Sequence, residues 1–382
     1  MRREIFSDEH DHFRAEVRRF VGAEIVPYLD EWNANGQCDR DIWRKMGAAG
    51  FLGANAPEVY GGGGVDFLFD AVVMEELAYH RAHTPQVSVH SDICMPYLAT
   101  FGSEAQKEKF LAPAISGECV LAIAMTEPGT GSDLAAVQTR AIRDGDEYVI
   151  NGAKTFISNG QSCDMVIVVA KTDPEASPPH RGISLLLVEA GTPGFERGRN
   201  LAKLGLKGQD TSELFFKDCR VPAENLLGAE GRGFKMLMEK LQQERLCIGV
   251  GSIASCRRSL DDTLDYVKNR KAFGQPIGQF QNTQFKLAEL ASQVEIGQAF
   301  VDKLLAAHVR GEDIVSEVSM SKWWTTDLQR KLSAECLQLF GGYGFMSEYP
   351  ISQDYADAAV QTIYAGTNEV MKMIIARKLG LG

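Results

Sequence analysis

The sequence lacks the features that assign many proteins to a class at once. No apolar run approaches the ~18 residues of a membrane span, and the net charge of −11 leaves no basic excess to bind nucleic acid. No C-x-x-C pair occurs among the eight cysteines, and no G-x-G-x-x-G stands between a strand and a helix. We therefore expect no membrane span, no nucleic-acid partner, no metal site and no Rossmann-type nucleotide site.

What is present is typical of a large globular protein. Hydrophobic residues make up 45% of the 382 and charged residues 24%, which predicts two or three packed units. The first residues, MRREIFSDEHDHF, include acids and have no apolar core, so they resemble neither a secretory signal nor a transit peptide. We expect a cytoplasmic protein whose cysteines are reduced thiols in the core.

The hydrophobic period changes twice along the chain. Residues 1–119 contain amphipathic segments ended by glycine or proline, which predicts an N-terminal helical domain. Residues 120–228 contain short apolar runs separated by Asp-Gly, Asn-Gly and Gly-Thr-Pro-Gly turns, which predicts a middle antiparallel β-domain. Residues 229–382 return to long helical segments, including 281–309 and 312–339, which predicts a C-terminal helical bundle domain. The expected fold class is mainly α with a β-domain, and a flavin or nucleotide would sit where the β-domain meets the bundle.

The segment TEPGTGSD, residues 126–133, is the first candidate binding loop. Its two glycines allow close backbone approach, and its small polar residues leave N–H groups free to face a phosphate or a ring. An ordinary surface turn has the same composition. This loop alone therefore does not decide between the two interpretations.

Glu244 is the second candidate, because it falls on an apolar helical stripe. The apolar members of that stripe are Phe234, Leu237, Met238, Leu241 and Ile248. One interpretation is a buried ion pair, for example with Arg245, since buried charges are usually paired. The other is a general base in a dry pocket, where burial raises the pKa of a carboxyl group and favours removal of a proton next to a carbonyl.

Six separated motifs resemble the acyl-CoA dehydrogenase family, in the family's order and over essentially the whole chain. They are AMTEPGTGSD (124–133), FISNG (156–160), LGLKGQDTSELFF (204–216), RKAFG (270–274), QLFGGYGF (338–345) and IYAGTNEV (363–370). Further segments are most similar to the long-chain branch of the family. These are HSDICMPY (90–97), QQERL (242–246), VKNRKAFG (267–274) and MSEYP (346–350).

The resemblance implies both an architecture and a reaction. The family has an N-terminal helical domain, a β-domain and a four-helix bundle, and it usually assembles as a homotetramer. Each subunit binds FAD and oxidises an acyl-CoA thioester to the trans-2-enoyl thioester, and electrons then pass to an electron-transferring flavoprotein. The resemblance to the long-chain branch implies a medium or long acyl chain and a role in fatty-acid catabolism.

The last motif departs from the commonest family pattern. Most members resemble Tyr-Glu-Gly-Thr and carry their base there, whereas this chain has Ala365, which cannot accept a proton. In the long-chain and isovaleryl branches the glutamate comes from the bundle helix instead, at the position that Glu244 matches. The resemblance therefore implies that Glu244 removes the α-proton while the β-hydride moves to the flavin.

The resemblance also implies roles for two sets of residues. The set that binds FAD is Met125, Thr126, Gly131, Ser132, Phe156, Ile157, Ser158, Arg270, Phe273, Gln281, Gln338, Gly341, Gly342, Thr367 and Glu369. The set that contacts substrate is Ser132, Leu241, Arg245, Tyr364, Ala365 and Gly366.

Some of these roles are more specific. Arg270, Phe273, Gln281 and Gln338 are implied to reach the FAD of a neighbouring subunit. The Ala365 N–H is implied to hold the acyl carbonyl together with a ribityl hydroxyl of FAD. Three positions depart from the family: many relatives have tryptophan, threonine and glutamine where this chain has Phe156, Ser158 and Glu369.

Three alternatives stay open at this point. Branched-chain, isovaleryl-like enzymes share the same base position. An oxygen-using flavoenzyme would keep the fold and the flavin, although acyl-CoA oxidases commonly carry a further C-terminal domain. An inactive acyl-CoA-binding paralogue would explain Ala365, and Glu244 is the residue that argues against it.

Overall fold

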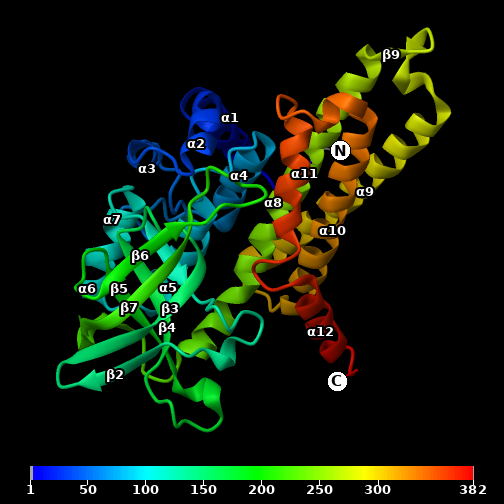
Figure 1. The fold of residues 1–382 in the computed structure, drawn as a ribbon. Helices are drawn as coiled ribbons and strands as arrows, with labels where there is room; N and C mark the ends of the chain where they lie inside the picture. The colour runs from blue at the N-terminus through cyan, green and yellow to red at the C-terminus, as the bar shows by residue number, and fades with distance from the viewer. Residues whose placement is uncertain (1–2, 382) are drawn as a thin grey trace.

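The computed structural model of the chain describes residues 3–381 and shows a β-domain flanked on two sides by helices (Figure 1). The N-terminal helices are α1 (Asp8–Glu24), α2 (Leu29–Asn35), α3 (Asp41–Ala48), α4 (Phe67–Tyr79), α5 (Met95–Phe101), α6 (Glu104–Gln106) and α7 (Ala112–Ile115). Between them lie the 3-10 helices η1 (Val26–Tyr28) and η2 (Glu58–Tyr60) and the π-helical segments η3 (Val89–Cys94) and η4 (Lys107–Leu111). Helix α1 begins directly after Ser7, as the sequence predicts. Helix α4 begins after Asp66, whose side chain caps it by accepting a hydrogen bond from the Leu68 N–H at 2.9 Å.

The middle segment forms one sheet in the order β6-β7-β3-β2-β4-β5-β8, with β1 added beside β4. Its strands are β1 (Leu121–Ala124), β2 (Arg140–Asp144), β3 (Glu147–Ser158), β4 (Met165–Lys171), β5 (Ile183–Glu189), β6 (Phe195–Asn200), β7 (Thr211–Pro222) and β8 (Leu226–Leu227), with turns η5 (Leu134–Ala136), η6 (Pro179–Gly182) and η7 (Ala223–Asn225). The predicted antiparallel pairing is confirmed for most neighbours, but β1 and β2 both pair with β4 in parallel.

One predicted turn is wrong. Asn151-Gly152 lies inside β3, where the register with β7 shifts between Ile150 and Gly152, and does not end a strand. A Cβ built at Gly152 would lie 2.4 Å from the Thr139 Oγ1. The glycine is therefore needed for close packing at a bulge and not for a reversal of the chain. The predicted Asp144-Gly145 turn does connect β2 to β3.

The C-terminal part is built around α8, which runs from the β-domain to the far end of the bundle, where β9 lies (Figure 1). Its elements are α8 (Gly233–Asn269), β9 (Lys271–Ala272), β10 (Gln275–Pro276), η8 (Ile277–Gln279), α9 (Gln281–Val309), α10 (Val315–Phe340), η9 (Gly341–Phe345), α11 (Pro350–Gln361) and α12 (Asn368–Lys378). Helices α9 and α10 confirm the helical segments predicted at 281–309 and 312–339. Within residues 3–381, no helix combines the length and the apolar character that a membrane crossing requires.

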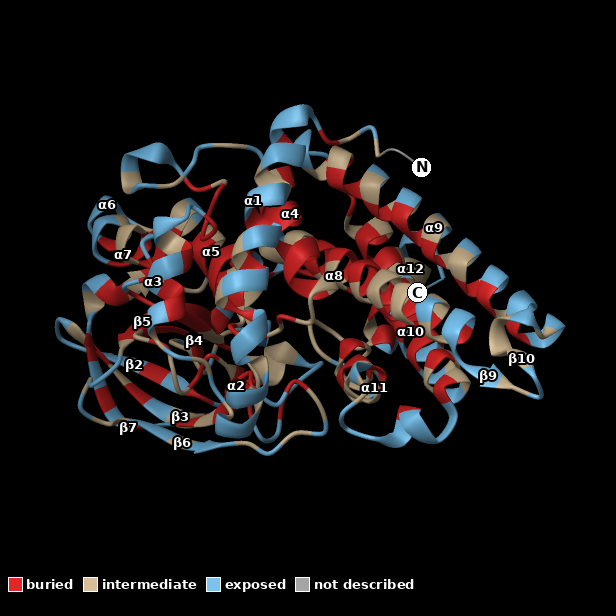
Figure 2. Cartoon of the chain, turned by 90° about the horizontal axis from the view of Figure 1, so that it is seen from above, coloured by how far each residue is buried: buried red, intermediate tan, exposed pale blue. Residues whose placement is uncertain are grey.

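Strand β4 explains how the parts are joined. Met165, Ile167 and Val169 face a core shared with the helices, whereas Val166 and Val168 face a second core inside the β-domain. A strand that is buried on both faces reads as a continuous apolar run, which is what MVIVVA is. Buried residues accordingly concentrate where helices and sheet meet (Figure 2).

Domain limits after residues 119 and 228 remain our proposal. The first limit falls in the connection between Ile115 and Leu121, and the second between Leu227 and Gly233. Both connections lie outside regular secondary structure for most of their length, which is where domain boundaries usually fall.

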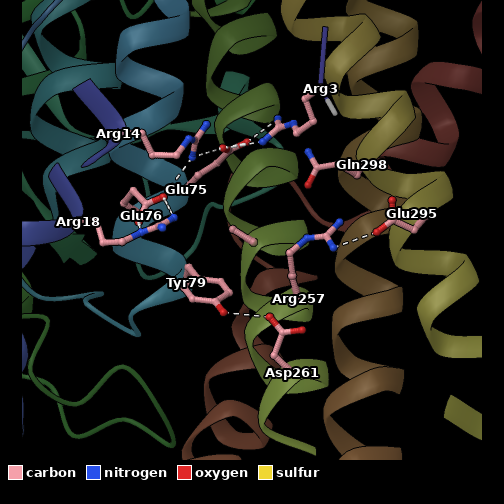
Figure 3. A pocket seen from close by; sticks show the side chains of 11 residues that line it. Arg3, Arg14, Arg18, Glu75, Glu76, Tyr79, Arg257, Asp261, Glu295 and Gln298 are labelled. Atoms are coloured by element: carbon pink, nitrogen blue, oxygen red, sulfur yellow. Dashed lines mark hydrogen bonds and ion pairs between the residues drawn. The ribbon is translucent and has the colours of Figure 1, made fainter. Parts of the chain in front are cut away.

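Charged side chains also join the N-terminal helices to the bundle, around a cavity of about 330 Å³ (Figure 3). The Arg3 guanidinium pairs with Glu75 on α4 at 2.6 Å and with Asp302 on α9 at 2.5 Å, so it bridges the two parts. The Tyr79 hydroxyl donates a hydrogen bond to Asp261 at 2.9 Å. The lining arginines and acids pair with one another, so this cavity is a polar contact between helices.

Candidate active site

A cavity of about 260 Å³ lies between the β-domain, α4 and the α8 helix of the bundle. Its lining brings together predicted site residues from four separate segments of the chain. They are Met125, Thr126, Phe156, Ile157, Ser158, Glu244, Tyr364 and Ala365. The predicted base, the predicted flavin-binding loops and the predicted carbonyl donor therefore face one space.

Glu244 is 4% exposed and points into this cavity from α8. The Tyr97 hydroxyl donates a hydrogen bond to its Oε1 at 2.9 Å. Burial raises the pKa of Glu244 to about 7, and the Tyr97 hydrogen bond and the positive charges of Arg245 and Lys240 offset only part of that rise. A carboxylate with this pKa can act as a general base near neutral pH.

Arg245 does not form the ion pair that the sequence left open. Within residues 3–381 the side chain of Glu244 has no cationic partner at ion-pair distance, and the Arg245 Nε, which is buried, has no hydrogen-bond partner. One residue of the apolar stripe, Met238, is 39% exposed, whereas its place in the stripe predicts burial. Periodicity places residues on a helix face, but it does not show how far the neighbouring domain covers that face.

The loop after α11 supplies a backbone donor. Ala365 has a φ of 50° and Gly366 a φ of 87°, both in the left-handed region. Such a conformation costs free energy for alanine and persists where the surroundings enforce it. No acceptor within residues 3–381 pairs with the Ala365 N–H, although the N–H of Tyr364 beside it is bonded to the Val360 carbonyl.

A buried lysine holds this loop in place. Lys322 on α10 is 0% exposed, and its Nζ donates to the Gly366 carbonyl at 2.7 Å and to the Asn368 Oδ1 at 3.1 Å. Burial lowers the pKa of Lys322 to about 8. The Tyr364 hydroxyl donates to Gln361 at 2.7 Å, which ties the same loop to the end of α11.

The β-domain wall presents an exposed aromatic ring. Phe156 lies in β3 at a register shift between Lys154 and Ile157, has a φ of 60° and is 67% exposed. The strained turn of the backbone presents the ring to the cavity and to solvent. The Ser158 hydroxyl lies beside it and accepts a hydrogen bond from the Gln209 Nε2 at 3.2 Å.

A buried ion pair holds the predicted binding loop to strand β3. Lys154 is 0% exposed, and its Nζ donates to the Glu127 Oε1 at 2.8 Å and to the Met125 carbonyl at 3.1 Å. The Thr126 carbonyl accepts from the Thr155 N–H at 3.0 Å. Part of the loop also closes on itself, because the Glu127 and Thr130 N–H groups each bond to the other residue's carbonyl.

The remaining predicted residues lie outside this cavity. Gly131 and Ser132 are exposed at the loop tip, and Thr367 caps α12, where its hydroxyl accepts from the Val370 N–H at 3.3 Å. Leu241 and Arg245 lie on α8, and Gly366 and Glu369 lie in the last segment, where Glu369 is exposed.

A separate group of predicted cofactor residues lies at the far end of the bundle (Figure 1). It comprises Arg270, Phe273, Gln281, Gln338, Gly341 and Gly342, at the ends of α8, α9 and α10. The Arg270 guanidinium lies 5.3 Å from the centre of the Tyr343 ring, and Phe273 is 97% exposed. This group does not face the cavity of its own chain, in keeping with its expected contact across a subunit boundary.

The residues around the cavity fit a flavin. The lining combines the Phe156 ring with Thr and Ser hydroxyls and with apolar side chains, a donor set that suits a planar heteroaromatic ring. Fold and cavity together are those of a class of flavoprotein in which a buried carboxylate and an exposed aromatic ring face one cavity.

The chain belongs to the acyl-CoA dehydrogenase family. Family models match its N-terminal domain at residues 7–118, its middle domain at 122–219 and its C-terminal domain at 231–380. Members are FAD-dependent enzymes that oxidise a CH–CH bond in fatty-acid metabolism, and this chain is one of them.

Individual relatives are similar over nearly the whole chain. The mouse long-chain specific acyl-CoA dehydrogenase is 50% identical, over 99% of this chain and 88% of its own. The isovaleryl-CoA dehydrogenase of Pongo abelii is 36% identical, over 97% of this chain and 88% of its own. The crystal structure of an acyl-CoA dehydrogenase from Geobacillus kaustophilus superimposes with a TM-score of 0.97 at 50% identity, covering 98% of both chains.

Proposed function

We propose that this enzyme oxidises a medium- or long-chain acyl-CoA to the trans-2-enoyl-CoA, with Glu244 as the base that removes the α-proton. The observation that carries the proposal is a buried glutamate that has no cationic partner within residues 3–381 and faces the same cavity as Phe156 and Ala365. A carboxylate that served only to stabilise the fold would be paired with a cation or with several N–H groups.

The chain supplies both groups that act on the acyl thioester. Glu244 takes the α-proton, and the free N–H of Ala365 donates to the carbonyl oxygen as negative charge develops on it. One such donor is typically worth about 3 kcal/mol in the transition state. Lys322 fixes the loop that carries this donor. The chemistry that FAD supplies when bound is acceptance of the β-hydrogen with its electron pair, so that the pair from the broken α C–H bond forms the double bond.

The wall of the cavity formed by α4 and α8 supports a long acyl chain. It includes apolar or small side chains such as Leu77, Ala78 and Gly251. A glycine inside a helix costs about 1 kcal/mol relative to alanine, so Gly251 needs a reason. A Cβ built there would meet no atom within 4 Å, which leaves room for the tail.

A panel of straight acyl-CoAs tests the chain length, with bleaching of bound FAD measured anaerobically. We expect kcat/KM to rise with chain length into the medium or long range. Gly251→Leu should move the optimum to shorter chains, whereas Gly22→Leu, at an exposed glycine of α1 far from the cavity, should not. If Gly251→Leu leaves the optimal chain length unchanged, the acyl tail does not lie beside Gly251.

The branched-chain alternative is decided by the same panel. The isovaleryl-CoA dehydrogenase relative shares the fold at lower identity, and its name supports a short branched substrate. If isovaleryl-CoA bleaches the flavin faster than every straight chain, the alternative replaces the long-chain proposal.

We infer that an electron-transferring flavoprotein accepts the electrons, as the family resemblance implies. Bleaching that is reversed by such a flavoprotein or by a dye, and only slowly by oxygen, supports this acceptor. Rapid reoxidation by oxygen favours the oxygen-using alternative. Binding of acyl-CoA without any bleaching favours the inactive paralogue.

We also propose a homotetramer in which Arg270 and Phe273 contact the FAD of a neighbouring subunit. The 97% exposure of Phe273 supports a protein surface that is covered by assembly. Arg270→Ala should weaken FAD retention measured by gel filtration. The expected cytoplasmic location stays a prediction, which fractionation of cells can test.

A further inference from the structure

The carboxylate of Glu244 has one hydrogen-bond partner within residues 3–381, the hydroxyl of Tyr97. Tyr97 belongs to α5 in the N-terminal domain, whereas Glu244 belongs to α8, so the bond crosses a domain boundary. The Tyr97 side chain is 0% exposed. Burial, followed by the charge of Glu244, raises the pKa of Tyr97 well above its usual range, so the hydroxyl stays protonated and donates.

The Tyr97 hydroxyl contacts Glu244 from the side that does not line the cavity. The described residues that line the cavity include Glu244 but not Tyr97. Tyr97 therefore contacts the base without contacting the space for the substrate. Its hydrogen bond occupies Oε1, and Oε2 accepts no hydrogen bond from the described part of the chain.

Resting on the proposed role of Glu244 as the base, we propose that Tyr97 is a positioning residue that fixes the carboxylate through Oε1 and leaves Oε2 to take the α-proton. A single hydrogen bond to one oxygen limits rotation of the carboxylate about its last torsion, which is otherwise broad. Catalysis at a reacting atom is sensitive to displacements of about 1 Å, so such an anchor affects the rate directly.

The other groups around Glu244 do not replace this anchor. The charged and titratable groups that face it from the packed elements are Lys240, Arg245 and Cys247 of α8, Cys94 of η3, and Tyr364 of the loop after α11. The cations act on Glu244 through charge alone, because neither donates a hydrogen bond to it. Burial raises the pKa of both thiols, and burial raises that of Tyr364, so these three groups are neutral around pH 7.

The bond also favours the ionised base. A hydrogen bond donated to a carboxylate stabilises the charged form and lowers its pKa, so the loss of the bond raises that pKa. Hydrogen bonds to charged groups are strong enough that the rise should be about one pH unit. A tyrosine that served only to fill the core would leave the titration of Glu244 unchanged.

The test titrates Glu244 directly and without turnover. The carboxyl stretch of Glu244 is isolated as the infrared difference between the FAD-loaded enzyme and its Glu244→Gln variant across pH 5 to 9. We expect a midpoint near 7 in the natural sequence and a midpoint about one unit higher with Tyr97→Phe. The matched control is Tyr79→Phe, which removes a tyrosine–carboxylate hydrogen bond of the same 2.9 Å length to Asp261 (Figure 3) and should leave the midpoint unchanged.

A second variant covers a failure of Tyr97→Phe to fold. Site-specific 3-fluorotyrosine at position 97 keeps the ring and makes the hydroxyl a stronger donor, so it should move the midpoint downward. The acid limb of kcat/KM for flavin bleaching should move with the midpoint in each protein. An unchanged midpoint in the folded phenylalanine variant, or in the fluorotyrosine variant, overturns the proposal.

This outcome is distinct from a failure of the proposed function. If Glu244 is not the base, Glu244→Gln retains flavin bleaching whatever the infrared titration shows. If Glu244 is the base and Tyr97 has no positioning role, Glu244→Gln is inactive while Tyr97→Phe keeps the natural titration and pH profile.

Discussion

Two buried glutamates, Glu127 beneath a loop of the β-domain and Glu244 in the lining of the cavity, differ in their partners although both are buried. Glu127, on the β-domain side, is 6% exposed and accepts hydrogen bonds from the Lys154 Nζ at 2.8 Å and from the Gln138 and Thr139 N–H groups at 2.5 and 2.9 Å. Glu244, on the bundle side, is 4% exposed and accepts one hydrogen bond, from a neutral tyrosine.

The partners, and not the burial, set the protonation of each carboxyl group. Burial alone would raise the pKa of Glu127, but the charge of Lys154 and the hydrogen bonds hold that pKa below its ordinary value. Burial raises the pKa of Glu244 to about 7, because the Tyr97 hydrogen bond and the charges of Arg245 and Lys240 offset only part of the effect of burial. Glu127 is therefore a structural anion that fixes the loop around Met125, and Glu244 is free to exchange a proton.

The largest expected effect is on turnover. Glu244→Gln keeps the shape of the side chain but removes the base, so steady-state dye reduction with acyl-CoA should fall by about 10³-fold or more. The protein should remain yellow, with FAD bound. Glu239→Gln, on the exposed side of the same helix, is the control and should keep its activity. Full activity in Glu244→Gln would remove the distinction between the two glutamates.

The next effect is on stability, at the other glutamate. Glu127→Gln leaves Lys154 buried without its counter-charge, so the free energy of unfolding should fall by about 3 kcal/mol. Denaturant unfolding at pH 7 measures the change. Glu147→Gln, which breaks the exposed pair with Arg220 in the same domain, should change stability little. Equal losses from both substitutions would show that the buried pair has no special role.

A smaller effect has the opposite sign. The pKa of Glu244 is about 7 in the folded protein and near 4.5 when unfolded, so the stability that this group contributes falls as pH rises from 4.5 to 7. Glu244→Gln escapes that loss and should be more stable than the natural protein by about 3 kcal/mol at pH 8. The gain should vanish near pH 4.5 when unfolding is measured at both values. If Glu244→Gln is less stable than the natural protein at pH 8, the ionised carboxylate of Glu244 does not destabilise the fold and this account of its pKa is wrong.

Periodicity predicted most of the fold but not its bulges. The order of helical, β and helical segments and the limits of α9 agree with the sequence pattern, because amphipathic spacing reports which faces are buried. The Asn151-Gly152 pair was predicted as a turn, since that dipeptide is typical of hairpins. Its role in close packing against Thr139 depends on a neighbouring strand that no local pattern reveals.

Sequence reasoning found the candidate base but not the residues that control it. Glu244 stood out because a charge fell on an apolar stripe. The sequence left its ion pair with Arg245 open, since distances between neighbouring side chains are not set by periodicity. Tyr97 and Lys322 were missed, because each acts across a domain or helix contact. The buried ion pair of Lys154 had one indication in the sequence, because this lysine stands in an otherwise apolar part of a strand.

The most direct test of the account is the rate of anaerobic FAD bleaching by acyl-CoA, measured in single turnovers across pH 5.5 to 8.5. In the natural sequence we predict that the rate rises about tenfold per unit below pH 7 and levels off above it, because the ionised fraction of Glu244 sets the rate. In Glu244→Gln the rate should be lower by about 10³-fold or more and should lack this limb. A Glu244→Gln variant that bleaches with the same acid limb as the natural protein would show that another group is the base.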